Sequence, residues 1–294
     1  MNKIQVGDVT ITSIIERAGP WRLPEAMFPD YDPETGRRHL AALGPVVFDA
    51  ASGKLNITYQ TFVVRTPHHT ILVDTCTGEN KNYPAPMDFD KQPWLDGLHA
   101  EGLGFPDIDY VFCTHLHIDH CGWNTRLVNN RWVPTFPNAK YVFHKAEYAA
   151  WEAVTQRGES PPGAGSPDKV WRMNCLPIVE AGQALLVDDD YSLDDTVTLT
   201  PTPGHSPCHC CVNITSRGQR AVVTGDLMHH ALQCREPEWS TIFCADPKQA
   251  AVSRRSFLAS VAETDTIILP VHFPAPTAGR IGADADRFTY NFLP

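Results

Sequence analysis

A short apolar strand that runs directly into a dense group of metal-binding side chains is the most constraining feature of this sequence. Residues 110–112 read Tyr-Val-Phe, and residues 115–120 read His-Leu-His-Ile-Asp-His, so four potential ligands fall within six residues. Imidazole and carboxylate groups suit zinc and other divalent transition ions, and a loop after a strand can direct alternate side chains toward one cavity. The alternative, a polar loop that uses histidine and aspartate only as turn formers, explains so dense a cluster poorly. The pattern therefore predicts a metal centre at a strand end.

Composition limits the kind of chain that carries this cluster. The sequence has 294 residues, of which 43% are hydrophobic and 20% are charged, and this is typical of a globular protein. A chain of this length folds without a metal or disulfide staple, so we expect any metal to be functional. The formal net charge is −10 and no run is rich in Lys or Arg, so we expect no nucleic-acid partner. Without a bilayer-spanning apolar run or the apolar core of a signal peptide, the expected protein is cytoplasmic and binds no membrane.

The nine cysteines are expected to be reduced thiols. Their number is odd, and adjacent residues such as Cys210 and Cys211 are poorly placed for a framework of disulfides. The segment from Cys208 to Cys211 has no second matching pair at zinc-finger spacing, so we interpret it as mostly strand. Cys208 and Cys121 are interpreted as packing residues.

Turn-bounded, β-branched runs predict a chain rich in strands. The predicted strands are 9–15, 57–64, 70–73, 109–114, 140–143, 196–200, 210–215, 221–224 and 266–269. The predicted helices are 94–100, 145–153 and 247–261, the last capped by Asp246. We expect a single domain, residues 1–294, of two β-rich halves with a sheet-on-sheet core. A Gly/Pro-rich loop at about 157–169 is placed near the site, and a segment at about 21–47 is either a dimer arm or a pocket lid.

Three further candidate ligands each follow a predicted strand. His205 comes after strand 196–200, Asp226 closes the strand that ends near residue 224, and His272 follows strand 266–269. A lone histidine or Gly-Asp pair is more often structural than functional. Because all three stand at the same topological place as the first cluster, together they indicate one shared site.

This order of residues, HxHxDH followed by a histidine, an aspartate and a final histidine, resembles the metallo-β-lactamase superfamily from about Val6 to His272. The resemblance implies an α+β fold, a four-layered αββα sandwich with the metals at one edge. It implies a first metal held by His115, His117 and His205, a second held by Asp119, His120 and His272, and Asp226 as the bridging ligand. Asp74 matches the family's early aspartate, which supports the ligand loop. Two divalent ions per chain are implied, with zinc favoured and manganese, cobalt or iron as alternatives.

Within that superfamily the chain is most similar to the quorum-quenching lactonases and the methyl parathion hydrolase group, through residues 223–230 and 271–281. The resemblance implies a hydrolase that opens a lactone or ester through a metal-bridging hydroxide, with Asp119 and Asp226 as catalytic carboxylates. Acyl-homoserine lactonases carry a tyrosine three residues after the bridging aspartate, where this chain has His229. An imidazole can also donate a hydrogen bond to substrate, so His229 is a catalytic candidate; a histidine without a role is the alternative.

Aromatic side chains near the ligands predict an apolar substrate pocket, for which Trp123, Phe28 and Phe273 are the candidates. They favour a small hydrophobic lactone or ester over a charged phosphate ester. The alternatives that stay open are a thioesterase of the glyoxalase II kind, an aryl phosphotriesterase and an iron-dependent persulfide dioxygenase. The resemblance also leaves a homodimer open.

Overall fold

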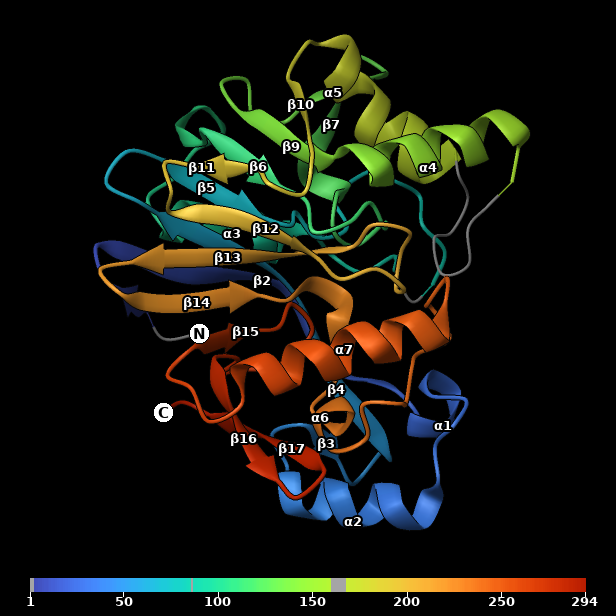
Figure 1. Cartoon of the computed structure of the whole chain (residues 1–294). Helices are drawn as coiled ribbons and strands as arrows, with labels where there is room; N and C mark the ends of the chain where they lie inside the picture. The colour runs from blue at the N-terminus through green and yellow to red at the C-terminus, as the bar shows by residue number, and fades with distance from the viewer. Residues whose placement is uncertain (1–2, 86, 160–167) are drawn as a thin grey trace.

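The first of two large sheets is built mainly from the N-terminal half of the chain (Figure 1). The computed structural model describes residues 3–85, 87–159 and 168–294. The strand order in this sheet is β1-β2-β4-β5-β6-β9-β10, with β3 paired to β4. The strands are β1 (Ile4–Val6), β2 (Val9–Arg22), β3 (Phe48–Asp49), β4 (Lys54–Arg65), β5 (Thr70–Val73), β6 (Tyr110–Phe112), β9 (Lys140–His144) and β10 (Ala184–Val187).

The second sheet follows the chain order from β11 to β17. Its strands are β11 (Ser192–Leu193), β12 (Val197–Pro201), β13 (Cys210–Ser216), β14 (Gln219–Val223), β15 (Ile267–Leu269), β16 (Gly279–Asp284) and β17 (Arg287–Phe292). A separate hairpin pairs β7 (Thr125–Val128) with β8 (Arg131–Pro134). Most neighbours are antiparallel, but β5, β6, β9 and β10 run parallel, as do β14 and β15, so the carboxyl ends of each parallel group share an edge.

Helices cover the outer faces of the two sheets. The α-helices are α1 (Pro24–Met27), α2 (Pro33–Leu43), α3 (Gln92–Ala100), α4 (Lys145–Arg157), α5 (Leu176–Glu180), α6 (Leu232–Arg235) and α7 (Pro247–Val261). Short 3-10 turns are η1 (Phe105–Asp107), η2 (Gly122–Asn124) and η4 (Gly225–Leu227), and η3 (Asp168–Cys175) is a π-helix. Figure 1 shows α4 at the side of the first sheet near β9, and α7 running beneath β13 and β14.

Alternation along the strands divides the apolar side chains between three cores. In β4, Val64 joins the core between the sheets, whereas its neighbour Val63 packs on the helix side with Trp94 of α3. In β14, Val223 faces the first sheet, whereas Val222 belongs to the core under α7. Because side chains alternate across a strand, both sheets bury both faces. The order helix, sheet, sheet, helix confirms the predicted four-layered α+β sandwich.

Each predicted strand and helix has a counterpart in the structure. The bounds 70–73 and 247–261 are those of β5 and α7, and Asp246 caps α7 by accepting a hydrogen bond from the backbone N–H of Gln249. Sequence analysis missed α2 and the hairpin of β16 and β17. Both carry signals, since Asp32 and Pro33 form a capped helix start and alternate apolar residues run from 288 to 292.

The two segments for which the sequence predicts no helix or strand do contain regular structure in part. Residues 21–47 hold the end of β2 together with α1 and α2. Of the loop predicted at about 157–169, residues 160–167 lie outside the described residues, and η3 begins at Asp168. In the part of the chain that the structure describes, no helix is long and apolar enough to cross a membrane.

Candidate metal centre

The predicted ligands meet where strands of both sheets end. The loop from His115 to His120 follows β6, His205 follows β12, η4 after β14 carries Asp226, and His272 follows β15. All of these side chains except Asp119 are buried, with exposed fractions of 3% or less. The fold therefore brings the four segments that the sequence singled out to one place.

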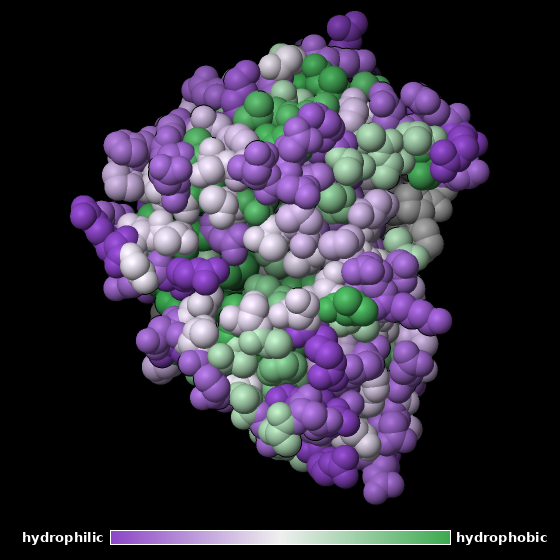
Figure 2. Space-filling view, viewed as in Figure 1, coloured by the Kyte–Doolittle hydropathy of each residue, from purple (hydrophilic) through white to green (hydrophobic). Residues whose placement is uncertain are grey.

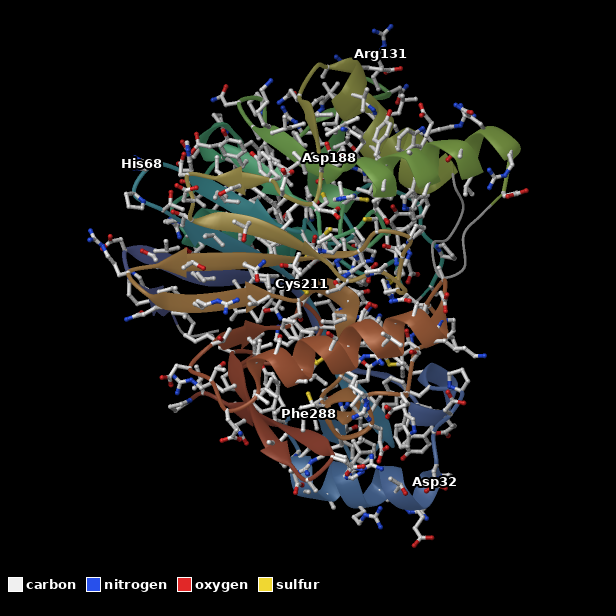
Figure 3. All side chains as sticks on the ribbon, in the orientation of Figure 1. Asp32, His68, Arg131, Asp188, Cys211 and Phe288 are labelled. Carbon is white, nitrogen blue, oxygen red and sulfur yellow. The ribbon has the colours of Figure 1, made fainter. Side chains whose placement is uncertain are left out.

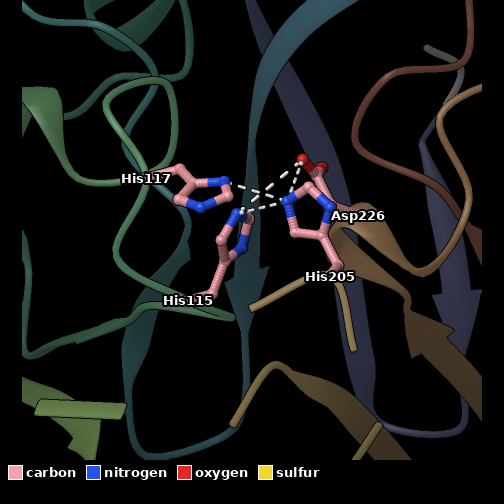
Figure 4. A group of neighbouring side chains, drawn as sticks. All are labelled: His115, His117, His205 and Asp226. Carbon is pink, nitrogen blue, oxygen red and sulfur yellow. Dashed lines mark hydrogen bonds and ion pairs between the residues drawn. The ribbon is translucent and has the colours of Figure 1, made fainter. Parts of the chain in front are cut away.

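Four of the side chains form a compact first group, shown in Figure 4. His205 stands at its centre, with its Nε2 atom 3.1 Å from His115 Nε2, 2.9 Å from His117 Nδ1 and 3.1 Å from Asp226 Oδ2. The three imidazole rings come from two different loops, yet their nitrogens converge on one point beside the carboxylate. These are nitrogen and oxygen donors of the kind that hold zinc.

A second group of Asp119, His120 and His272 lies on the other side of Asp226. Asp119 oxygens are 3.7 Å from His120 Nε2 and 3.6 Å from His272 Nε2. Asp226 turns its Oδ1 atom to this group, 3.1 Å from His120 Nε2 and 2.9 Å from His272 Nε2. One Asp226 oxygen thus faces each group, which is the placement that a bridging ligand requires.

The charge balance of the cluster suits metal binding. Burial and the neighbouring histidines lower the pKa of His115 and of His117 well below the ordinary value, so both imidazoles are neutral at neutral pH. Burial by itself would raise the pKa of Asp226, but the surrounding histidines, His120 foremost, hold it well below its ordinary value. Burial alone would lower the pKa of the other three histidines, but the Asp226 carboxylate raises that of His205 to about 9 and also raises those of His120 and His272. A cation would take the place of these protons, because imidazole binds a metal in its neutral form and carboxylate in its ionised form.

Buried polar atoms without partners provide the test of whether metal ions fit. His120 Nε2 and Asp226 Oδ1 face each other at 3.1 Å but have no hydrogen bond of acceptable geometry within residues 3–85, 87–159 and 168–294. Leaving such groups unpaired is costly, and ligands of one ion are expected to approach each other in this way. With five imidazoles and two carboxylates directed inward, the donor set fits two divalent ions.

Acceptors outside the cluster orient its rings. Asp74, on the loop after β5, has its Oδ2 atom 2.8 Å from His120 Nδ1 and accepts hydrogen bonds from the backbone N–H and hydroxyl of Thr114. The backbone carbonyl of Thr58 lies 2.8 Å from His272 Nδ1. Fixing Nδ1 in this way leaves Nε2 free to face the centre. Asp74 therefore makes the contact that the sequence resemblance led us to expect.

His209 is a buried residue of the site that sequence analysis did not single out. Its Nε2 atom accepts a hydrogen bond from the backbone N–H of Asp226 at 2.9 Å, and its Nδ1 atom is 2.7 Å from Thr202 Oγ1. The ring therefore fixes the backbone that carries the shared carboxylate. Its position four residues after His205 was the available signal.

A cavity of about 240 Å³ opens beside the two groups. Its apolar walls are Met27, Ile57, Met87, Ile118 and Phe243, and its polar walls, besides the predicted ligands His117, Asp119, Asp226 and His272, are Arg22, Tyr59 and His229. His229 lies between η4 and α6, and its Nε2 atom is 3.1 Å from Asp226 Oδ2. Sequence analysis missed most of these walls because they come from segments that are far apart in the chain.

The prediction that Trp123, Phe28 and Phe273 line the substrate pocket was wrong for this cavity. All three are buried in the cores, with exposed fractions of 1% or less. Trp123 stacks on Trp94 with ring centres 4.6 Å apart and donates a hydrogen bond to Glu16. Proximity in sequence to the ligands misled the prediction, because η2 turns this side chain toward α3 and away from the centre.

We expect Trp123→Ala to act on stability and not on substrate choice. Removing a fully buried, stacked indole should lower the free energy of unfolding by about 3–5 kcal/mol. Urea unfolding of the variant would measure the loss, with Trp132→Ala, at a half-buried tryptophan of β8, as the matched control and a smaller expected effect. An unchanged stability together with an altered preference for substrate chain length would contradict this.

Comparison with known proteins gives a family match over most of the chain. The model of the Metallo-beta-lactamase superfamily matches residues 58–272. An N-acyl homoserine lactonase of Bacillus cereus is 25% identical over 175 residues, which are 53% of this chain and 57% of that protein. The N-acyl homoserine lactonase AttM of Agrobacterium fabrum (strain C58 / ATCC 33970) is 30% identical over 125 residues, 40% of each chain. The chain thus spans about half the length of the curated relatives it matches.

Solved structures resemble the whole fold. AidC, a dizinc quorum-quenching lactonase in complex with a product N-hexanoyl-L-homoserine, superposes with a TM-score of 0.81 at 21% identity, covering 100% of this chain and 98% of that one. A hydrolase of the beta lactamase superfamily, AbOPH, also gives a TM-score of 0.81 at 21% identity, covering 99% and 97%. At this identity the likeness shows the fold alone.

Proposed function

Because this chain belongs to the metallo-β-lactamase superfamily of metal-dependent hydrolases, we propose that it opens a hydrophobic lactone or ester at a centre of two divalent ions. The observation that carries the proposal is the convergence of five histidines and two aspartates beside a largely apolar cavity. The proposed ligands are His115, His117 and His205 for one ion, Asp119, His120 and His272 for the other, and Asp226 for both. Zinc suits these nitrogen and oxygen donors, as manganese, cobalt and iron also do.

The chain's own groups provide proton transfer and orientation. When bound, two divalent ions supply an activated water near neutral pH and polarise a carbonyl group. Asp226, whose Oδ1 and Oδ2 atoms face the two groups, is placed to hold a proton and to pass it to the leaving alkoxide. Asp119 is less buried than the other ligands and lines the cavity, so we propose that it orients the reacting water.

His229 is proposed to bind the substrate carbonyl. The ring lines the cavity, its Nε2 atom lies 3.1 Å from Asp226 Oδ2, and its Nδ1 atom has no hydrogen bond to any described residue. Burial lowers its pKa to about 3, so at neutral pH the ring is neutral and carries one N–H that can donate. A neutral donor stabilises negative charge that develops on a carbonyl oxygen without adding a like charge to the metal centre.

The cavity wall supports an apolar acyl or alkyl group on the substrate. Met27, Ile57, Met87 and Phe243 offer methyl, thioether and ring surface beside Asp226. Curated relatives named N-acyl homoserine lactonase and a structural neighbour described as a quorum-quenching lactonase also favour a lactone.

Proton release by the zinc-loaded protein tests the proposal directly. One plate would hold long-chain and short-chain homoserine lactones, a γ-lactone, an aryl ester, a glutathione thioester and an aryl phosphotriester. We expect the lactones and the aryl ester to be the fastest substrates. Preference for the thioester or the phosphotriester would replace the proposal by one of those activities, and one iron per chain with sulfite production would indicate a persulfide dioxygenase. Four statements stay predictions from the sequence. The protein is expected to bind no nucleic acid and no membrane, to be cytoplasmic, and a homodimer is left open.

We expect Phe243→Ala to weaken binding of long acyl chains selectively. The half-buried Phe243 ring lies against the His229 ring, with centres 6.0 Å apart, at the cavity wall. Loss of this surface should raise KM for a long-chain lactone about tenfold and change KM for a short-chain lactone much less. Phe257→Ala on α7, which does not line this cavity, is the matched control. Equal effects on both chain lengths would remove Phe243 from the acyl site.

The donor role of His229 predicts different outcomes for two aromatic replacements. His229→Phe should lower kcat/KM by about 10²-fold because the ring keeps its volume but loses the N–H. His229→Tyr restores a donor and should recover most of that loss. Metal content, measured for both variants, should stay that of the unchanged protein. Full activity of His229→Phe would show that the ring has no catalytic role.

A further inference from the structure

A second group of metal-binding side chains lies outside the site described above. It consists of His144, Cys208 and Cys210, whose Nε2 and Sγ atoms all lie within 4.8 Å of one another. His144 is the last residue of β9 and caps α4, Cys210 begins β13, and Cys208 lies two residues before it. His144 and Cys210 are buried and Cys208 is half-buried. We call these three residues the thiol cluster.

Carboxylates surround the thiol cluster. Asp189 Oδ1 is 2.7 Å from His144 Nε2, and Glu147 accepts a hydrogen bond from the backbone N–H of Cys208 at 2.8 Å. Asp188, labelled in Figure 3, belongs to the same loop after β10, and Figure 2 shows hydrophilic residues over this part of the surface. A negative environment disfavours a bare thiolate but favours a thiolate that binds a cation.

A surface hollow reaches His144 and Asp189, while Cys208 and Cys210 are not among its lining residues. The hollow has a volume of about 490 Å³ and is lined by His144, Lys145, Ala146, Ala149, Asp188, Asp189 and Asp190. Lys145, the cation on its wall, is paired with Asp188 at 2.7 Å, so its charge is balanced. Asp189 is largely exposed, so its side chain has room to change from hydrogen-bond acceptor to ligand.

We propose that His144, Cys208 and Cys210 bind one zinc-class ion, with Asp189 as the fourth ligand. Two sulfurs, one imidazole and one carboxylate are all donors that zinc accepts, and together they provide the four ligands of a tetrahedral site. Binding displaces the protons of the two thiols and moves the His144 proton from Nε2 to Nδ1. In this structure the Nδ1 atom accepts a hydrogen bond from the backbone N–H of Ala146 at 3.2 Å. This long capping hydrogen bond would be lost when the ion binds, and the new bond between His144 and the ion would compensate for it.

The proposed ion would link β9 and α4 to the segment that carries His205. Glu147 of α4 already bonds to this segment through the Ser206 hydroxyl at 2.9 Å and through the backbone of Cys208. An ion bound by His144, Cys208 and Cys210 would add a second link between these elements, beside the Glu147 hydrogen bonds. The interpretation of residues 208–211 as mostly strand did not detect the cluster because its third ligand stands 64 residues earlier in the chain.

Titration of the metal-free full-length chain with Co²⁺ tests the proposal. The ligands proposed for the catalytic centre are nitrogen and oxygen atoms, so an intense near-ultraviolet band from sulfur to cobalt charge transfer reports on the thiol cluster. We expect three equivalents of Co²⁺ per chain and a sulfur band. Cys208→Ser and Cys210→Ser should remove the band and one equivalent of metal. His144→Asn keeps a side-chain acceptor for the Ala146 N–H. In this variant the Co²⁺ affinity that is measured from the sulfur band should be at least tenfold weaker.

Cys244→Ser is the matched control, because Cys244 is a buried thiol 3.7 Å from His205 Nδ1. The band should persist in this variant. Absence of a sulfur band at three equivalents, a band that survives both Cys208→Ser and Cys210→Ser, or a band lost in Cys244→Ser would each overturn the proposal. X-ray absorption of the unmutated chain loaded with three zinc ions needs no variant, and it should show a zinc–sulfur shell at about 2.3 Å. A spectrum with nitrogen and oxygen neighbours alone would equally refute the site.

Discussion

Asp226→Ala is expected to lower kcat by about 10³-fold or more and to reduce the metal content of the catalytic centre. Among the described residues, Asp226 is the side chain whose two oxygens face both proposed metal groups, at 3.1 Å from His205 Nε2 and 2.9 Å from His272 Nε2. Its removal takes a ligand from each ion and the proposed proton carrier from the reaction. Steady-state kinetics of the zinc-loaded variant and metal analysis after gel filtration would measure both effects.

Two further variants separate the roles of Asp226. Asp226→Asn keeps the volume and one oxygen, but an amide cannot accept a proton and release it again during turnover, so we expect partial metal retention with a loss of kcat close to that of Asp226→Ala. Asp265→Ala, at a fully exposed carboxylate, should leave kinetics and metal content unchanged. If Asp226→Ala turned over lactone at the unchanged rate, neither the bridging role nor the proton role would survive.

The side chains that meet at the candidate metal centre could be predicted from the sequence because each one stands in a short local pattern at the end of a strand. The loop from His115 to His120 is six residues long, and His205, Asp226 and His272 each follow a run of β-branched residues. The parallel strands then bring these ends to one edge. The fold followed from the same strands, since their alternation sets which faces are buried.

The cavity wall could not be predicted in the same way. Arg22, Met87 and Phe243 are far apart in the sequence and meet only because β2, the loop after β5 and the segment before α7 converge on the ligands. Side-chain direction decides the matter even for residues next to a ligand, as Trp123 shows by packing on Trp94. The thiol cluster could not be predicted for the same reason, since His144 of β9 meets Cys210 of β13, in the other sheet, and Cys208 just before that strand.

Asp74→Asn is expected to weaken metal binding by about 10–100-fold through a residue that is not itself a proposed ligand. The Asp74 carboxylate is fully buried and lies 2.8 Å from His120 Nδ1, and it accepts two hydrogen bonds from Thr114. An amide offers one oxygen in place of two, so its NH₂ group must face either the Thr114 N–H or the His120 N–H, both of which are donors. The His120 ring then loses its fixed orientation and its basicity toward a metal ion.

Asparagine is the informative replacement because the backbone at Asp74 has a φ of 57°, a left-handed conformation that asparagine tolerates and alanine does not. Zinc titration against a chromophoric chelator would give the affinities. Asp109→Asn is the matched control, since its carboxylate accepts a hydrogen bond from the backbone N–H of Thr70 at the opposite end of the same parallel strands. It should bind metal normally. If the zinc affinity of Asp74→Asn stayed within twofold of that of the unchanged protein, the orientation of His120 would depend on its own loop. The buried Asp74 carboxylate would then contribute to folding alone.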